Sequence, residues 1–211
     1  MSRHRSVLIT AVLAAAVLVA GCADSGFHYV KSSEDKTYFK VPSSWSLFDE
    51  KAIVSRAGAD LTETERQTVL DETWRVGFDA SPRPSLRHVS GVGSGHPAGL
   101  AVVRNLSFDV SDNISNSTLR NYFFDVDTAL QDQTGELLDY EELQLDGGFR
   151  GSHLVANLTV DAKPITINQI TLLDQATTKV YALIVTCSQD CYDRNKGQIE
   201  KVVDSWTVRD T

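Results

Sequence analysis

The chain has 211 residues, 42% of them hydrophobic and 23% charged, with a formal net charge of −8. This length is enough for one domain with a substantial core and short for two. The acidic balance argues against nucleic acid as a partner and against peripheral binding to anionic lipid, because both ligands require clustered Lys and Arg.

The first residues predict an export signal. Arg3 and Arg5 precede residues 7–20, an apolar run in which Thr10 is the single polar residue. The run is short for a membrane-spanning helix, which needs about 20 apolar residues, and is typical of a secretory signal. It ends in LVAGC, which resembles the bacterial lipobox, with the small residues Ala20 and Gly21 directly before Cys22 and leucine at position 18.

The resemblance implies cleavage before Cys22 and attachment of a diacylglyceryl group to its sulfur. Such an anchor would hold the protein on the outer face of a bacterial cell membrane without a spanning helix. An ordinary signal peptide with a chance cysteine and an uncleaved anchor are the alternatives.

These features divide the chain into a signal peptide at 1–21, a lipidated cysteine and tether at 22–36, and a single domain at 37–211. The mature chain would have 190 residues, with 18 basic and 28 acidic side chains and a net charge of −10. Phe27–Tyr29 could instead begin a first strand.

The first half of the domain mixes strands with one helix. TYFKVP and WSLF, joined by Pro-Ser-Ser, predict a hairpin over residues 37–48. Thr62 and Glu65 have the spacing of a capping box and predict a helix to about Asp71. Residues 73–79 and the valine-rich segment that begins at Gly99 predict strands.

The second half predicts an amphipathic helix, several strands and a closing helix. Apolar residues at helical spacing favour one helix over about 117–130. Strands are expected at about 137–145, 149–160, 165–174 and 178–187, because apolar residues alternate and turn residues separate the segments. A helix over about 191–205 precedes a terminal WTV.

Sequential strands with short turns predict an α+β domain with a mainly antiparallel sheet of about six or seven strands packed between helices, an α/β/α sandwich. The segments YFKVPSSWSLFDE and IEKVVDSWTV resemble the opening and closing elements of PsbP-like (Mog1/PsbP fold) domains. The resemblance covers residues 37–209 by element order and implies an accessory or binding protein. It carries over no functional residue.

Cys187 and Cys191 predict a structural disulfide between a strand end and a helix start. Disulfides persist outside the cytoplasmic membrane, and a turn at Ser188–Asp190 would bring the two cysteines within bonding range. A reactive redox pair or a metal site is the alternative, although redox pairs favour two intervening residues and this pair has three.

Residues 80–98 form a long Pro-, Gly- and Ser-rich segment, and loops of this length are usually functional or disordered. Arg83, Arg87, His88 and His96 make it basic on an acidic protein, so it is a possible loop for an anionic ligand or glycan. Plain flexibility explains it equally well.

Two further segments match chemical motifs only in part. GSGHPA fits a dinucleotide-binding pattern, but it precedes a strand and contains Pro97. Asp125, Asp127 and Glu136 have calcium-loop spacing, but leucine occupies the position that requires glycine. No cofactor, metal site or catalytic residue is therefore predicted.

The sequence favours a membrane-tethered, non-catalytic binding or accessory domain, with an envelope protein or ligand as partner at a sheet edge or loop. The alternative is a cell-envelope enzyme acting on wall or lipid substrates. Its site would combine His88, His96 and His153 with nearby carboxylates.

Overall fold

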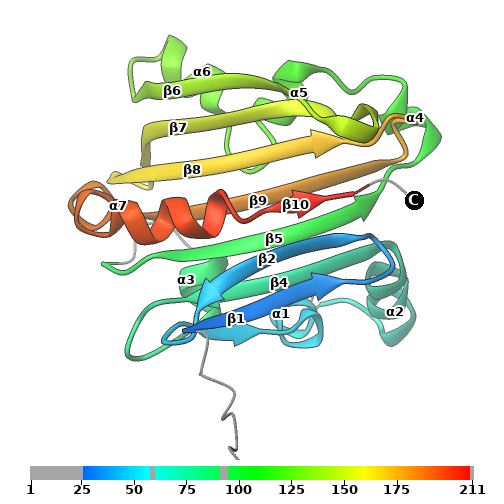
Figure 1. The fold of residues 1–211 in the computed structure, drawn as a ribbon, viewed down its shortest axis with the longest axis horizontal. Helices are drawn as coiled ribbons and strands as arrows, with labels where there is room; N and C mark the ends of the chain where they lie inside the picture. The colour runs from blue at the N-terminus through cyan, green and yellow to red at the C-terminus, as the bar shows by residue number, and fades with distance from the viewer. Residues whose placement is uncertain (1–25, 58–59, 91–94, 210–211) are drawn as a thin grey trace, which may run out of the picture.

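Two antiparallel sheets organise the chain. The computed structural model describes residues 26–57, 60–90 and 95–209, so Cys22 and the signal segment lie outside the described residues. The central sheet has seven strands in the order β3 (Ser46–Phe48), β4 (Thr73–Asp79), β5 (Ala98–Asn105), β9 (Lys179–Ser188), β8 (Lys163–Leu173), β7 (Arg150–Val160) and β6 (Gly135–Gln144) (Figure 1). The small sheet consists of β1 (Phe27–Ser32), β2 (Thr37–Pro42) and β10 (Thr207–Val208).

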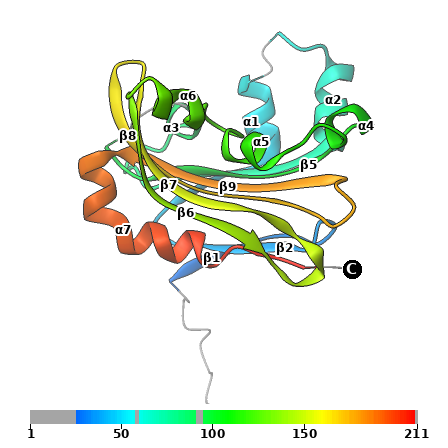
Figure 2. The same ribbon diagram turned by 90° about the horizontal axis from the view of Figure 1, so that it is seen from above.

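Helices and the small sheet cover the two faces of the central sheet. The helices are α1 (Glu50–Ala57), α2 (Glu63–Glu72), α3 (Leu86–Ser90), α4 (Phe108–Ser111), α5 (Asn116–Arg120), α6 (Val126–Gln131) and α7 (Gln189–Val203), with a 3-10 turn η1 (Asp146–Gly148). Figure 2 shows α1 to α6 on one side of the sheet and α7 with the small sheet on the other. The predicted α+β class and antiparallel sheet are confirmed. One outer layer consists of helices, and the other consists of α7 together with the small sheet.

The folded body begins earlier than the expected domain boundary at residue 37. Residues 27–32 form β1, which pairs with β2 from Phe27–Pro42 to Ser32–Thr37. Val30 is buried in the core, so this segment is part of the domain. Of the expected tether 22–36, residues 22–26 alone precede the first strand.

The predicted hairpin between β2 and β3 is wrong, because the two strands belong to different sheets. A turn in which the Trp45 amide donates to the Pro42 carbonyl over 2.9 Å carries the chain from one sheet to the other. Trp45 is 3% exposed and its ring stacks on Phe78 of β4 with centroids 6.0 Å apart. Burial of the tryptophan between the sheets therefore overrides the local preference for a hairpin.

The predicted helix over 117–130 is also wrong and is divided into α5 and α6. Asn121 ends α5, and the Asp125 side chain caps α6 by accepting from the Thr128 amide. Leu119 of α5 and Val126 of α6 are both fully buried but belong to different core clusters. Two short helices can place Leu119 and Val126 in separate clusters, whereas one straight helix would contact a single cluster.

An aromatic cluster joins the small sheet to the central sheet. Phe39 of β2 packs against Phe78 at 5.9 Å and against Trp206 at 5.4 Å between ring centroids. Gly99 of β5 lies opposite Phe78, where a Cβ atom would collide with the Phe78 ring and the Ile184 carbonyl. The close approach of ring and strand thus requires glycine at this position.

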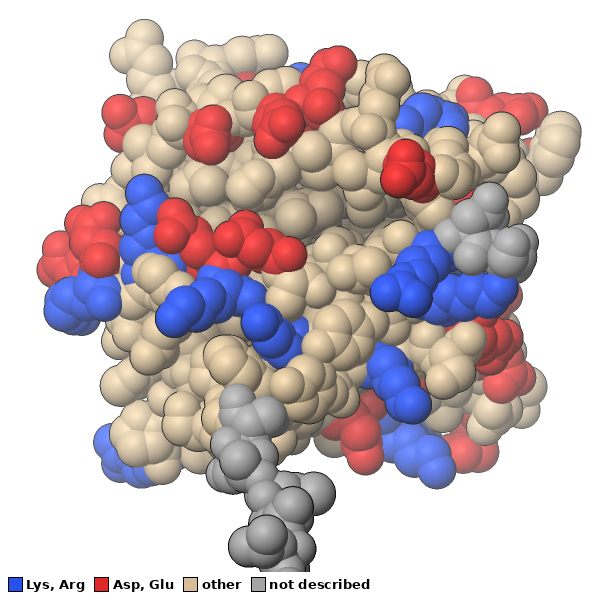
Figure 3. All heavy atoms as spheres, in the orientation of Figure 1, with Lys and Arg blue, Asp and Glu red and all other residues tan. Residues whose placement is uncertain are grey.

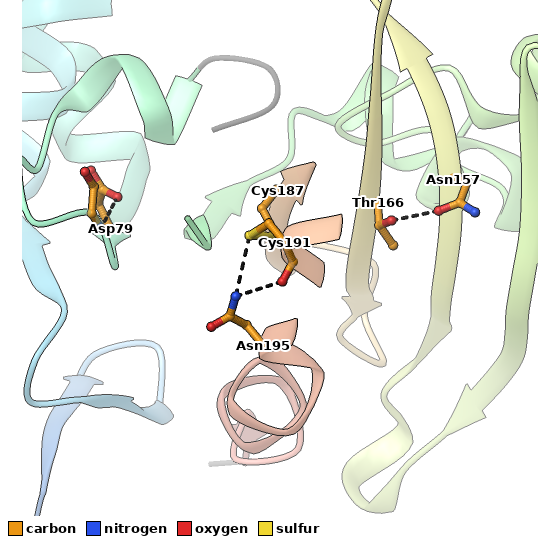
Figure 4. The surroundings of a disulfide bond; sticks show 7 residues. Asp79, Asn157, Thr166, Cys187, Cys191 and Asn195 are labelled. Atoms are coloured by element: carbon orange, nitrogen blue, oxygen red, sulfur yellow. Dashed lines mark hydrogen bonds between the residues drawn. A yellow bond between two sulfur atoms is a disulfide. The ribbon is translucent and has the colours of Figure 1, made fainter. Parts of the chain in front are cut away.

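The structure contains the Cys187–Cys191 disulfide at the junction of β9 and α7, with Cα atoms 5.8 Å apart (Figure 4). Both cysteines are fully buried. The Asn195 side chain, one turn further along α7, donates to the Cys191 carbonyl over 2.8 Å. The disulfide therefore ties the first turn of α7 to the central sheet.

Replacing both cysteines with serine is expected to lower the free energy of unfolding by about 2 kcal/mol, because a closed loop this short constrains the unfolded chain only modestly. Urea unfolding of the exported protein measures the change, and reductant should destabilise the natural chain by a similar amount. Intact mass that shows two free thiols in natively exported protein would contradict the disulfide.

Glu50 gives the fold a pH dependence. It begins α1 and faces Arg75 of β4, with Oε1 and Nε 3.7 Å apart. Burial of the carboxyl raises the pKa of Glu50 from 4.5 to about 7, even though the Arg75 charge acts in the opposite direction. The folded chain holds this proton more tightly than the unfolded chain, so stability is lost as the pH rises from 4.5 through 7.

Glu50→Gln is expected to remove this loss, which is on the order of 2 kcal/mol. The measurement is the free energy of unfolding of both chains from about pH 4 to about pH 8. The other ionisable groups are the same in the natural chain and in Glu50→Gln, so the difference between their stability curves reports Glu50 alone. Parallel curves would refute the raised pKa.

Candidate functional site

A cleft of about 470 Å³ lies between α7 and strands β6, β7 and β8. Its floor consists of alternate residues of two paired strands: His153, Val155 and Asn157 of β7, and Thr166 and Asn168 of β8. Their sequence neighbours Leu154, Ala156, Ile165 and Ile167 point to the opposite face and pack in the core beneath α6. Period-two alternation therefore places a polar floor directly over an apolar core.

Helix α7 forms one wall of the cleft. Its cleft-facing residues recur at helical spacing along the whole helix: Gln189, Tyr192, Asp193, Lys196 and Glu200, followed by the C-cap residue Asp204. Cys191, Ile199, Val202 and Val203 are buried against the small sheet and the central sheet. The helix therefore packs through one side and presents a polar side to the cleft.

The edge strand β6 forms the other wall through a β-bulge. Leu137 lies opposite Ala156 and Asp139 lies opposite Val155, so Leu138 is the extra residue. The bulge turns Asp139 toward the cleft and leaves Leu138 at its mouth, 49% exposed. Bulges at sheet edges commonly redirect side chains beside binding sites.

Asn168 connects the polar groups of the floor. Its side-chain oxygen lies 2.8 Å from Nε2 of His153, and its amide nitrogen donates to the Tyr192 hydroxyl over 3.0 Å. Burial raises the pKa of Tyr192, so the phenol stays protonated. The hydroxyl has no acceptor among the described residues, which leaves its proton available to a ligand.

The rim of the cleft is acidic. It carries Asp139, Asp193, Glu200 and Asp204, against a single lysine, Lys196, whose ammonium lies 3.7 Å from Glu200. Figure 3 shows Asp and Glu side chains over β6 and along the cleft side of α7, with Lys and Arg below them. Amide, imidazole and hydroxyl groups beneath an acidic rim suit a polar or cationic group.

The basic segment expected at 80–98 is organised from beneath by Asp79, which is fully buried. Its carboxylate accepts from the Ser81 amide over 2.9 Å and the Ser85 amide over 2.8 Å, and it lies 2.7 Å from Nδ1 of His88. Part of the segment forms α3, a helix that the sequence analysis missed, and residues 91–94 lie outside the described residues.

The side chains of that segment do not form one site with His153. Arg83, Arg87 and His96 are exposed, and His88 is held by Asp79. Helix α3 packs on the side of the sheet opposite α7 (Figure 2), whereas His153 lines the α7 cleft. The histidine cluster suggested for an enzyme is therefore divided between two faces.

Metal-binding geometry is absent from residues 26–57, 60–90 and 95–209, which contain no group of three or more His, Cys, Asp or Glu placed to hold an ion. Asp127, weighed above as a calcium ligand, instead accepts from Ser117 over 2.7 Å and Asn121 over 2.9 Å and pairs with Arg120. These donors lower the pKa of Asp127, and Arg120 contributes most.

Comparison with solved structures identifies the fold. CyanoP, the PsbP protein of the cyanobacterium Synechocystis sp. PCC 6803, aligns over 93% of this chain and 99% of its own, with a TM-score of 0.54 and 15% identity. LpqN of Mycobacterium tuberculosis aligns over 87% of this chain and 91% of its own, with a TM-score of 0.50 and 15% identity.

No protein-family model and no curated protein matches the sequence. At these identities the structural similarity establishes the fold alone. The protein has the PsbP-like (Mog1/PsbP) fold that the opening and closing segments of the domain resemble.

The floor network should be measurable as an energetic coupling. Asn168→Ala is expected to destabilise the protein by about 2 kcal/mol, because the buried Tyr192 and the half-buried His153 each lose a hydrogen-bond partner. Tyr192→Phe should cost about 1 kcal/mol. Urea unfolding of both single variants and the double variant gives the coupling, and simple additivity would show that the two groups do not interact.

Proposed function

We propose that the protein is a membrane-tethered accessory module on the outer face of a bacterial cell, which binds an envelope partner along the β6 edge and the adjoining cleft. The lipobox-like LVAGC supports the tether, with Cys22 as the lipidated residue. Among the described helices, none is long and apolar enough to cross a bilayer.

The observation that carries the binding role is the exposed edge of β6. The strand is ten residues long, pairs with β7 on one side and leaves the other side open. Leu137 and Leu138 are 39% and 49% exposed. An open strand edge of this kind is a template for an added strand of a partner.

The charges at this edge define the partner's chemistry. Asp139 and Glu141 lie on the cleft face of β6, opposite Val155 and His153 of β7. Together with the acidic rim of α7, they favour an extended segment that carries basic and apolar side chains. The cleft would then receive a side chain of that segment beside Tyr192.

The fold relatives support this assignment in general terms. LpqN is described as involved in cell envelope biogenesis, and the anchor at Cys22 would place this chain in the same compartment. The dispersed histidines remove the site suggested for the enzyme alternative, so no catalytic role is proposed.

The test is photo-crosslinking in the native envelope with benzoylphenylalanine at Leu138, followed by mass spectrometry of the attached protein. One dominant partner is expected. The control places the same probe at Thr68, an exposed residue of α2 on the opposite side of the sheet, and should capture little.

Reversing the edge charge should weaken capture. Asp139→Lys with Glu141→Lys is expected to reduce the crosslinked fraction at least tenfold if the partner segment is basic. Equal yields from Leu138 and Thr68, or yields unaffected by charge reversal, would contradict the proposed mode of binding.

A further inference from the structure

The outward face of the small sheet differs in charge from the rest of the molecule. Side chains on β1 and β2 alternate, so Val30, Phe39 and Val41 face the core. The opposite face carries three aromatic residues and three basic residues: Phe27, Tyr29, Tyr38, Lys31, Lys40 and Arg209, which follows β10. The described strands place no carboxylate on this face.

The two tyrosine rings on this face are exposed, and Phe27 is half-buried. Tyr29 is 59% and Tyr38 36% exposed, and their rings stack with centroids 6.1 Å apart. The Lys40 ammonium lies 4.9 Å from the centre of the Phe27 ring. Tyrosine and lysine, each with an apolar body and a polar tip, are the residues that proteins place at the boundary between water and lipid.

A groove of about 500 Å³ lies at one end of this face, around Tyr38 and Thr207. Lys31, Lys36 and Arg209 line it. None of these three cations has a carboxylate partner within the part of the chain that the structure describes. Three unpaired cations around an open groove match the phosphate of an anionic lipid headgroup.

The carboxylates of the β1–β2 turn point elsewhere. Asp35 pairs with Lys179 at 2.6 Å, and both Glu34 and Asp35 line a separate cavity beside Glu50. Neither carboxylate forms an ion pair with the three cations of the groove, so the groove keeps its positive charge. Surface charges are screened within about 8 Å at physiological ionic strength, so the local charge decides contact with a surface.

The length of chain before β1 brings this face to the membrane. Five residue steps separate Cys22 from Phe27, and an extended chain spans at most about 18 Å over that length. The tether would join β1 at its Phe27 end, whereas the basic groove lies at the Ser32 end. Anchor and groove would thus fix the two ends of one face.

We propose that the outward face of β1, β2 and β10 docks on the anionic headgroups of the membrane that carries the anchor. This inference rests on the proposed lipidation of Cys22. Docking would leave β6, at the opposite edge of the central sheet from β3, to one side of the docked face and not beneath it (Figure 1). The acidic cleft opens on the same side of the central sheet (Figure 2), so its repulsion from an anionic surface would tilt the β6 edge away from the bilayer.

The experiment uses the lipoprotein purified from membranes and reconstituted into vesicles of 70% phosphatidylcholine and 30% phosphatidylglycerol. A polarity-sensitive fluorophore is attached to a cysteine at Tyr29 or, as the control position, at Thr64 of α2. The label at residue 29 should report a lipid interface and be quenched by brominated lipids, whereas the label at residue 64 should remain in water.

A matched pair of variants tests the charge requirement. Lys31→Gln, Lys36→Gln and Arg209→Gln together should lower the ratio of docked to undocked protein about 100-fold, since each basic residue near an anionic surface contributes about fivefold. Lys51→Gln, Arg56→Gln and Lys163→Gln remove the same charge from other exposed positions and should have little effect.

The outcomes separate docking from anchoring. Protein that floats with the vesicles while both labels remain in water would overturn docking and leave the anchor intact. An equal signal in pure phosphatidylcholine would overturn the role of anionic headgroups. Protein that does not float would overturn the anchor, and the inference with it.

Discussion

The packing of four aromatic rings between the two sheets is the contact on which the rest of the structure depends. Trp45 and Phe39 approach Phe78 from different segments, and Trp206 closes the cluster from the end of the chain. Aromatic side chains bury large areas, so such a cluster contributes much of a small core. It holds the small sheet and the adjoining end of α7 in place, and α7 forms one wall of the cleft.

The regular elements could be predicted from the sequence because their signals are local. The strand at 73–79 and the capping box at Thr62 are both found where they were expected. The β2–β3 hairpin and the long helix were wrong for a shared reason: the decisive contacts come from distant residues. Local turn chemistry cannot reveal that Trp45 packs on Phe78, or that Leu119 and Val126 enter different clusters.

The cleft was missed for a related reason. Its members come from β6, β7, β8 and α7, and no short motif contains more than a few of them. One signal was present: Thr166 and Asn168 are polar residues that alternate with the apolar Ile165 and Ile167 on the same strand. Buried polar residues need partners, so this alternation indicates a polar layer above the sheet. The composition of residues 80–98 suggested a ligand-binding loop. The structure shows instead that Asp79 holds this segment through the Ser81 and Ser85 amides and His88.

The distribution of charge qualifies what the net charge excludes. A strongly acidic chain argues against contact with anionic lipid when its charges are evenly mixed, and here they are not. Acidic groups collect around β6 and α7, while the outward face of the small sheet is aromatic and basic. At contact distance the local arrangement of charge outweighs the net charge, so one molecule can carry two surfaces of opposite charge.

The pairing of β2 with β10 has a consequence for the order of folding. The Thr37 hydroxyl donates to the Thr207 carbonyl across 170 residues of chain, and Trp206 enters the core beside this pair. A chain emerges from its amino-terminal end during synthesis, and it would do so again during the export proposed above. One side of β2 therefore stays unpaired until Thr207 and Val208 have emerged and can form β10. The small sheet is therefore among the last parts of the domain to be completed.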